Sequence, residues 1–234
     1  PESWHDYWPS QTRNRPGDPR PEVKSVSGLN MAHFDWGPVD VDDSEMGDTQ
    51  VVDWVIGQLR AEHGQPLFLA CGIFRPHLPW YAPRQYFERF PVEHIQLPTH
   101  RDQDLDDIPD AGVKMAKPFR DHAAVLKRNQ WHAAVQGYLA SISYADRQVG
   151  RLLEALDASA HASKTIVVLW TDHGWHLGEK KHWRKFALWE EATRTPLIFV
   201  APPGTPGLAK GTPAGIRRDK PVSLLDIYPT LVAR

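Results

Sequence analysis

Three short stretches of the sequence carry residue types that can bind a metal ion or move a proton. Asp172 and His173 stand side by side after an apolar run, where they offer one carboxylate and one imidazole. Lys185 closes a basic cluster that begins at Lys180, and lysine binds anions as a mobile point charge. His77 lies between two prolines, and a histidine held in this way can give a proton to a leaving group near neutral pH. Together these residue types are those of a metal and anion site.

Each stretch also has a purely structural interpretation. An Asp-His pair is often a capped turn, and a divalent ion needs more ligands than two. Basic runs are usually solvated, although Trp183 and Phe186 indicate that this one is packed. His77 equally suits a rigid turn, and Cys71, inside an apolar run, is interpreted as a small core residue rather than a nucleophile. The acidic stretch 102–107 lacks the glycine and glutamate of a calcium loop, so we exclude that interpretation.

Composition restricts the class of protein. The chain has 234 residues, of which 41% are hydrophobic and 24% charged, as expected for one large globular domain or a substantial part of one. A formal net charge of −2 does not support a nucleic-acid or membrane surface, and no apolar run is long enough to span a bilayer. The first residue is Pro1, and no basic-then-apolar leader follows it. One cysteine excludes an internal disulfide framework.

Apolar spacing predicts the elements that must position these residues. Fully apolar runs predict three buried strands, at 66–74, 165–172 and 196–203. Helical spacing predicts four helical segments: 51–63 capped by Asp48 or Thr49, one or two turns in 84–90, a long helix over 126–156, and 223–232 capped by Ser223. We expect irregular structure in 1–47, in the proline-rich stretch 75–83, and in 97–122, a polar surface excursion.

The order of these elements favours an α/β fold with a mainly parallel sheet flanked by helices on both faces. In such sheets ligands bind outside the carboxyl ends of the strands. His77 follows the first predicted strand, and the Asp172–His173 pair follows the second. The sequence therefore predicts that these side chains meet in one crevice.

Four stretches together resemble the sulfatase family of the alkaline-phosphatase superfamily, especially its iduronate-2-sulfatase-like and choline-sulfatase-like branch. They occur in family order and cover 66–91, 137–156, 171–203 and 221–231. The resemblance implies an alkaline-phosphatase-like α/β fold, an exported protein (periplasmic, extracellular or lysosomal), and a sulfated small molecule or sulfated carbohydrate as substrate. It also implies one divalent cation, usually calcium, and a cysteine or serine oxidised to formylglycine that attacks the sulfur of a sulfate ester.

The resemblance also assigns roles to single residues. Asp172 and His173 match the family's late pair of metal ligands, and many members have Asn in place of His173. Lys185 matches the lysine that contacts the sulfate group and the bridging oxygen, and His77 matches the histidine that helps protonate the departing alcohol. The two other histidines of the motif, His176 and His182, occupy variable positions and receive no catalytic role.

The family's nucleophile signature, early Asp-Asp metal pair and further lysine and histidine do not occur in the sequence. We therefore expect the C-terminal portion of a sulfatase catalytic domain, with an irregular segment at 1–47 and an incomplete α/β portion at 48–234. One alternative is a phosphodiesterase, phosphonate hydrolase or phosphatase of the same superfamily, which the missing nucleophile region would distinguish. Another is a non-catalytic binding or assembly protein that keeps the scaffold.

We expect the 234-residue chain by itself to hydrolyse no sulfate ester, because two metal ligands, a histidine and a lysine do not complete a hydrolytic site without a nucleophile. The measurement is the turnover of an aryl sulfate by the purified chain. Measurable turnover would contradict this expectation.

Overall fold

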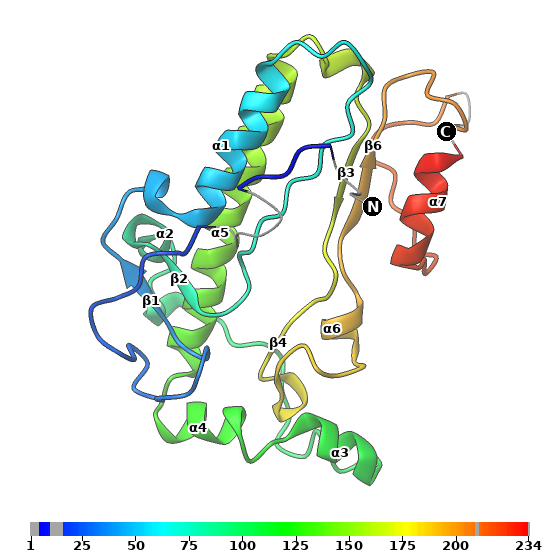
Figure 1. Ribbon diagram of the computed structural model, residues 1–234. Helices are drawn as coiled ribbons and strands as arrows, with labels where there is room; N and C mark the ends of the chain where they lie inside the picture. Colours follow the sequence, from blue (N-terminus) through cyan, green and yellow to red (C-terminus); the bar gives the residue numbers. More distant parts are fainter. Residues whose placement is uncertain (1–4, 10–15, 209–210, 234) are drawn as a thin grey trace.

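Two long helices form the largest packed unit of the computed structural model, which describes residues 5–9, 16–208 and 211–233. Helix α1 (Gly47–Arg60) and helix α5 (Trp131–Asp157) lie side by side (Figure 1). Val52 and Ile56, four residues apart on one face of α1, pack against Ala155 of α5. Both helices were predicted, although α1 begins before the expected caps. No helix among the described residues is both long and apolar enough to cross a bilayer.

A parallel pair of short strands lies against α5. Strand β1 (Trp36–Val39) pairs with β2 (Trp80–Pro83), and helix α2 (Arg84–Glu88) follows directly. The predictions of irregular structure were wrong at both strands, and a short 3-10 turn, η1 (Asp43–Glu45), also lies in the N-terminal segment. Proline is tolerated in β2 because Pro83 stands at the end of a two-stranded ladder, where a missing N–H disturbs little pairing. Residues 1–4 and 10–15 of that segment lie outside the described residues.

The predicted strands at 165–172 and 196–203 form as β3 (Val167–Trp170) and β6 (Leu197–Val200), but they pair antiparallel. They were predicted to be buried, whereas Trp170 is 49% exposed and Val200 57% exposed. The prediction of a buried strand at 66–74 was wrong: the segment has no strand pairing, and Phe68 is 69% exposed. A strand needs a hydrogen-bonded partner, and none of the described strands pairs with this run. A parallel pair occurs only at β1–β2 among the described strands.

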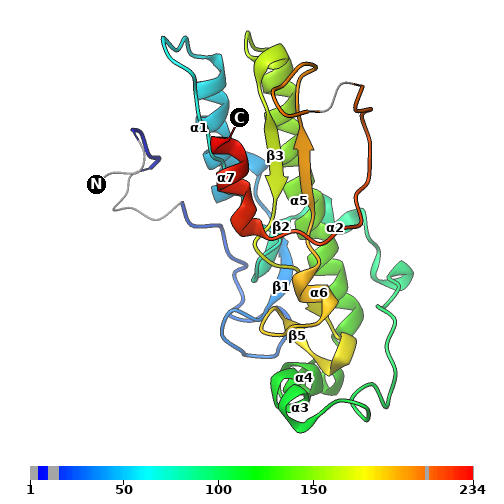
Figure 2. The same ribbon diagram turned by 90° about the vertical axis from the view of Figure 1, so that its right-hand side faces the viewer.

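The remaining elements are short. Helices α3 (Asp110–Ala116) and α4 (Asp121–Lys127) lie at the same end of the molecule in both views (Figures 1 and 2), and they replace part of the irregular structure expected in 97–122. A hairpin of β4 (His176–Leu177) and β5 (Trp183–Arg184) follows β3, with the turn η4 (Glu179–Lys181) between them. The turn η2 (Val92–His94) follows α2, and the turn η3 (Ala162–Lys164) lies between α5 and β3. Helix α6 (Glu190–Thr193), the turn η5 (Leu224–Asp226) and helix α7 (Ile227–Val232) follow the hairpin. Ser223 caps η5 as predicted, since its hydroxyl accepts the Leu225 N–H.

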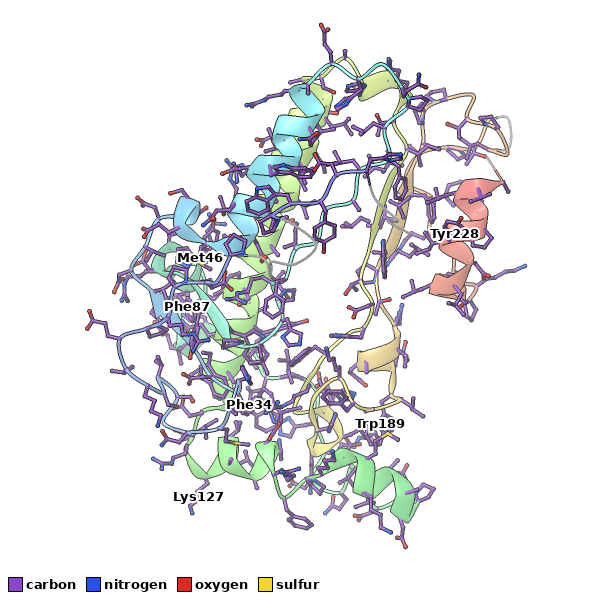
Figure 3. All side chains as sticks on the ribbon, in the orientation of Figure 1. Phe34, Met46, Phe87, Lys127, Trp189 and Tyr228 are labelled. Atoms are coloured by element: carbon purple, nitrogen blue, oxygen red, sulfur yellow. The ribbon has the colours of Figure 1, made fainter. Side chains whose placement is uncertain are left out.

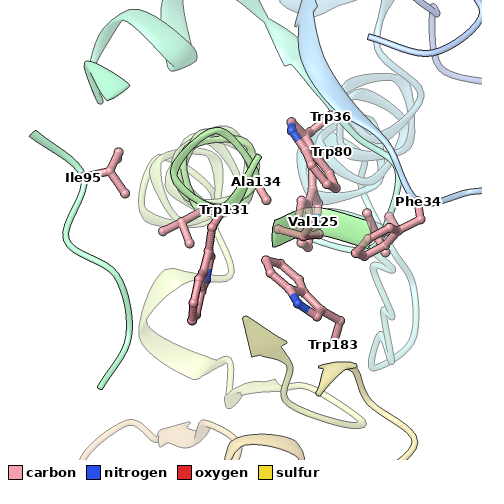
Figure 4. Close-up of a cluster of buried hydrophobic side chains, with 10 residues drawn as sticks. Phe34, Trp36, Trp80, Ile95, Val125, Trp131, Ala134 and Trp183 are labelled. Carbon is pink, nitrogen blue, oxygen red and sulfur yellow. The ribbon is translucent and has the colours of Figure 1, made fainter. Parts of the chain in front are cut away.

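Aromatic side chains hold the hairpin, the parallel strands and α5 together. Trp36, Trp80 and Trp183 are at most 2% exposed, and Phe34 packs edge-on against Trp36 and Trp183 (Figure 4). A second cluster, which includes Met46 and Phe87, fills the space beside α1 and α5 (Figure 3). The hairpin is therefore anchored on the core although it has only two residues in each strand.

Gly137 is the point where α5 comes closest to the parallel strands. A Cβ atom at this position would lie 2.7 Å from the Cβ of Trp36 and 3.4 Å from that of Trp80. Gly150, also on α5, has no atom within 4 Å of the corresponding position. The two glycines are therefore matched in helix context and differ in the space around them.

We expect Gly137→Ala to lower the free energy of unfolding by about 1–3 kcal/mol, because the added methyl group overpacks the contact with Trp36. Gly150→Ala should raise the free energy of unfolding by about 0.5–1 kcal/mol, because alanine loses less backbone entropy in a helix. Denaturant unfolding of both variants measures the difference. Equal free energies of unfolding for the two variants would show that the packing of α5 against Trp36 does not require a glycine at position 137.

Candidate active site

The side chain of Lys185 brings two distant histidines together. Its Nζ lies 2.7 Å from Nε2 of His173 and 3.2 Å from Nε2 of His77. The three side chains line a cavity of about 390 Å³. The other lining residues are Ile73, Phe74, Arg75, Pro76, Tyr138, Thr171, Asp172, Gly174 and Trp175. All four residues singled out from the sequence, Asp172 included, therefore line one cavity.

Backbone carbonyls fix which ring nitrogen carries the proton in each histidine. Nδ1 of His77 lies 2.8 Å from the carbonyl oxygen of Leu78, and Nδ1 of His173 lies 2.9 Å from that of Gly174. A carbonyl oxygen only accepts hydrogen bonds, so in both rings Nδ1 is the donor. The neutral rings therefore present an Nε2 lone pair to the cavity, and the Lys185 ammonium donates to both.

Burial lowers the pKa of His77, and the nearby cationic side chains of Lys185 and Arg75 lower it further. The hydrogen bond from its ring to the carbonyl of Leu78 acts in the opposite direction. The imidazole is therefore mainly neutral at pH 7, with an unprotonated Nε2 beside the lysine.

Asp172 and His173 supply two donors that suit one divalent cation. Oδ2 of Asp172 lies 3.6 Å from Nε2 of His173, and perpendicular bonds of 2.3–2.6 Å place neighbouring ligands about 3.3–3.7 Å apart. One oxygen and one nitrogen lone pair thus fit adjacent positions on an ion, once Lys185 releases the nitrogen. The described residues contain no cluster of three or more His, Cys, Asp or Glu side chains with metal-binding geometry. By themselves, these two donors would be only part of a ligand set.

Gly174 lets the chain after these donors pass close to α6. A Cβ atom here would lie 2.0 Å from the carbonyl oxygen of Glu191, and the Gly174 N–H donates to the carbonyl of Ala192 at 2.8 Å. Any larger residue would push the strand end away from α6. The glycine of the Asp-His-Gly motif therefore sets the position of the two donors.

The β4–β5 hairpin returns the chain so that Lys185 faces the cavity. Its turn is held by the Lys180 ammonium, which donates to Asp104 at 2.9 Å, and its second strand by Arg184, which donates to Asp121 at 2.6 Å. The indole N–H of Trp131 donates to the carbonyl of Leu177 at 2.7 Å. The acidic stretch excluded as a calcium loop thus anchors the turn through Asp104, a contact for which the sequence carries no signal.

The remaining histidines of the motif lie outside the cavity lining. His176 is 0% exposed and His182 is 4% exposed, and their rings pack against each other with centroids 4.9 Å apart. Cys71 packs beside the α1–α5 contact, and burial raises its pKa to about 11. Its thiol is protonated at neutral pH, which agrees with a core residue. The aromatic cavity residues Phe74, Tyr138 and Trp175 were missed. Phe74 and Tyr138 lie in apolar patterns, where an aromatic residue cannot be distinguished from core.

Comparisons with known proteins agree on one family. The sulfatase family model matches residues 2–234. A sulfatase from Formosa agariphila is 42% identical over 214 residues, with 89% of this chain and 40% of that protein covered. Human iduronate 2-sulfatase is 34% identical over 184 residues, with 73% of this chain and 33% of that protein covered. The chain thus spans 40% or less of the length of either relative.

Solved structures show the same fold at lower identity. A phosphonate monoester hydrolase from Silicibacter pomeroyi superposes with a TM-score of 0.61 at 24% identity, over 71% of this chain and 35% of that one. A putative sulfatase from Bacteroides thetaiotaomicron superposes with a TM-score of 0.51 at 17% identity, over 81% of this chain and 40% of that one. The chain therefore shares the alkaline-phosphatase-like α/β fold of these structures over part of its length, whereas the described strands form three two-stranded sheets rather than the mainly parallel sheet that was predicted.

We expect acid to destabilise the hairpin through His176, whose pKa is lowered to about 4 by burial and by neighbouring His182. Because the folded pKa lies below the unfolded value of about 6.5, this destabilisation grows as the pH falls from about 6.5 to about 4 and reaches about 3 kcal/mol. Denaturant unfolding at several pH values should show a smaller loss for His176→Gln than for the parent. The same change at His132, exposed on α5, serves as control. An equal acid loss in parent and His176→Gln would refute the prediction.

Proposed function

Because the chain belongs to the sulfatase family, we propose that the complete protein is a sulfuric ester hydrolase and that residues 1–234 supply part of its active site. The observation that carries the proposal is the meeting of His77, Lys185 and the Asp172–His173 pair at one cavity. A metal-ligand pair, an ammonium and an imidazole are the groups that cleavage of an anionic ester needs around its nucleophile. The nucleophile we propose is the formylglycine of the family, contributed by polypeptide outside this chain.

We propose that Asp172 and His173 hold one divalent cation, calcium by family resemblance. A bound cation supplies positive charge that stabilises the negative oxygens of the sulfate group as the ester bond breaks. Calcium prefers oxygen ligands, whereas imidazole suits transition metals such as zinc. Since His173 stands where many family members have Asn, elemental analysis of the complete protein should include both kinds of metal.

Lys185 is suited to bind the sulfate group, and His77 is suited to protonate the departing alcohol. The ammonium is a point charge on a flexible side chain, so it can turn from the two imidazoles towards a sulfate oxygen. An imidazole protonated at Nε2 of His77 can donate to the bridging oxygen as the S–O bond breaks. Burial and Lys185 keep the imidazolium fraction small at neutral pH, which favours this step at mildly acid pH.

The rest of the complete protein follows from the same proposal. Its sheet would be mainly parallel with helices on both faces, and further strands beside β3 and β6 would cover their exposed apolar residues. Its substrate would be a sulfated small molecule or a sulfated carbohydrate, in keeping with the substrate that the name iduronate 2-sulfatase implies for the human relative. By resemblance we also propose an exported protein.

The test uses the complete protein, with 4-nitrophenyl sulfate and sulfated sugars as substrates. We expect turnover that a chelator abolishes, and an Asp172→Ala variant whose cation affinity is lower by at least about 10-fold, since loss of even a supporting contact has this effect at metal sites. Asp107→Ala, at an exposed aspartate, should retain both metal and activity. Calorimetry and elemental analysis measure the metal.

Three outcomes would contradict the proposal. Unchanged metal content in Asp172→Ala would exclude Asp172 as a ligand. Turnover of a phosphonate monoester without turnover of any sulfate ester would identify the phosphonate-hydrolase alternative. Binding of sulfated sugars without turnover would identify a non-catalytic binding protein.

A further inference from the structure

Arg75 is a buried cation next to the cavity. Only 3% of the residue is exposed, and its guanidinium donates at 2.6 Å to Oδ2 of Asp18. It also donates to two backbone carbonyls, at 3.0 Å to that of Tyr81 and at 3.4 Å to that of His77. One planar group therefore cross-links both sides of the loop that carries His77 to a residue of the N-terminal segment.

Asp48 holds the other side of the same loop. This carboxylate is 0% exposed in the first turn of α1, and it accepts the N–H groups of Phe74 and Arg75, both at 2.9 Å. The second oxygen of Asp18 accepts the N–H of Gly47 at 3.0 Å. Both carboxylates thus lie at the N-terminus of α1, where the helix dipole favours negative charge. The loop is fixed to the start of a long, well-packed helix.

We propose that Arg75, together with Asp18 and Asp48, is a positioning residue that fixes the backbone on either side of His77 and thereby directs Nε2 at the bridging oxygen of the substrate. The inference rests on the proposed function, in which His77 protonates the leaving group. Buried ion pairs add little stability compared with apolar residues of similar volume. The arginine is instead matched to its acceptors, since a lysine has no planar fork that reaches two carbonyls and a carboxylate at once.

The leaving group of the substrate separates positioning from simple stabilisation. A nitrophenolate leaves without a proton, whereas an alkoxide from an alkyl or sugar sulfate needs one. A misplaced His77 therefore slows only the second class of substrate. A loss of folded protein, of metal or of sulfate binding slows both classes equally.

We expect Arg75→Lys in the complete protein to lower kcat for an alkyl sulfate by about 100-fold, the effect of a displacement of about 1 Å. KM and the kcat for 4-nitrophenyl sulfate should change little. His77→Ala should show the same pattern, and the double variant should lose no more than the worse single variant, because the two residues act as one unit. The matched control is Arg84→Lys, since Arg84 forms an ion pair with Asp40 at the surface and lies outside the cavity lining.

Equal losses for both substrates, or additive losses in the double variant, would overturn the proposal. A crystal structure of Arg75→Lys gives a readout that does not depend on activity: His77 Nε2 should move by more than about 0.5 Å, the tolerance of a productive site. A smaller movement of Nε2 would overturn the positioning proposal, whether or not the complete protein hydrolyses sulfate esters. A complete protein that hydrolyses no sulfate ester would refute only the proposed function. If Arg75→Lys does not fold, Asp18→Asn keeps the arginine, releases its guanidinium from the carboxylate, and should show the same substrate dependence.

Discussion

The geometry of the site depends on one ammonium group held between two imidazole nitrogens. Both histidines give their Nδ1 proton to a backbone carbonyl, so each has a lone pair on Nε2, and Lys185 Nζ donates to both. The loop of His77 and the segment that carries His173 and Lys185, which are far apart in the sequence, thereby meet at one point. The arrangement persists only if these two segments are held at a fixed separation.

That separation is set by the aromatic core. Trp80 lies three residues after His77, and its indole N–H donates to the carbonyl of Pro76 at 2.8 Å. Trp183 lies two residues before Lys185, and the rings of Trp80 and Trp183 lie 6.3 Å apart in the same cluster (Figure 4). The core contact therefore fixes the distance between the loop of His77 and the hairpin of Lys185. Its tryptophans contribute to the site as well as to stability.

Local signals in the sequence predicted the two long helices and the cap at Ser223, because apolar spacing and caps act within a few residues. They did not predict the short helices α3, α4 and α6. They also identified the four polar residues that meet at the cavity, since His77, Asp172 and His173 follow apolar runs and Lys185 closes a basic cluster. Pairings between distant segments were not predicted. The β1–β2 ladder has four residues in each strand, and both strands contact α5, which begins more than 45 residues later in the sequence. Arg75 was missed for a similar reason, because an arginine beside a proline carries no signal that its guanidinium will be buried against the carboxylate of Asp18.

The polar groups of the cavity differ in how firmly the chain holds them. His77 and Lys185 each lie two residues after a buried side chain: Arg75 is 3% exposed and Trp183 is 2% exposed. The carboxylate of Asp172 is 73% exposed and follows β3, whose last residue, Trp170, is itself 49% exposed. Side chains locked by packing keep their geometry, whereas an exposed carboxylate must lose rotamer freedom when it binds an ion. The loop of His77 and the hairpin of Lys185 are thus fixed by buried residues of this chain, whereas the carboxylate of Asp172 is largely exposed. In the proposed hydrolase, a bound cation and the polypeptide that covers β3 would order this carboxylate.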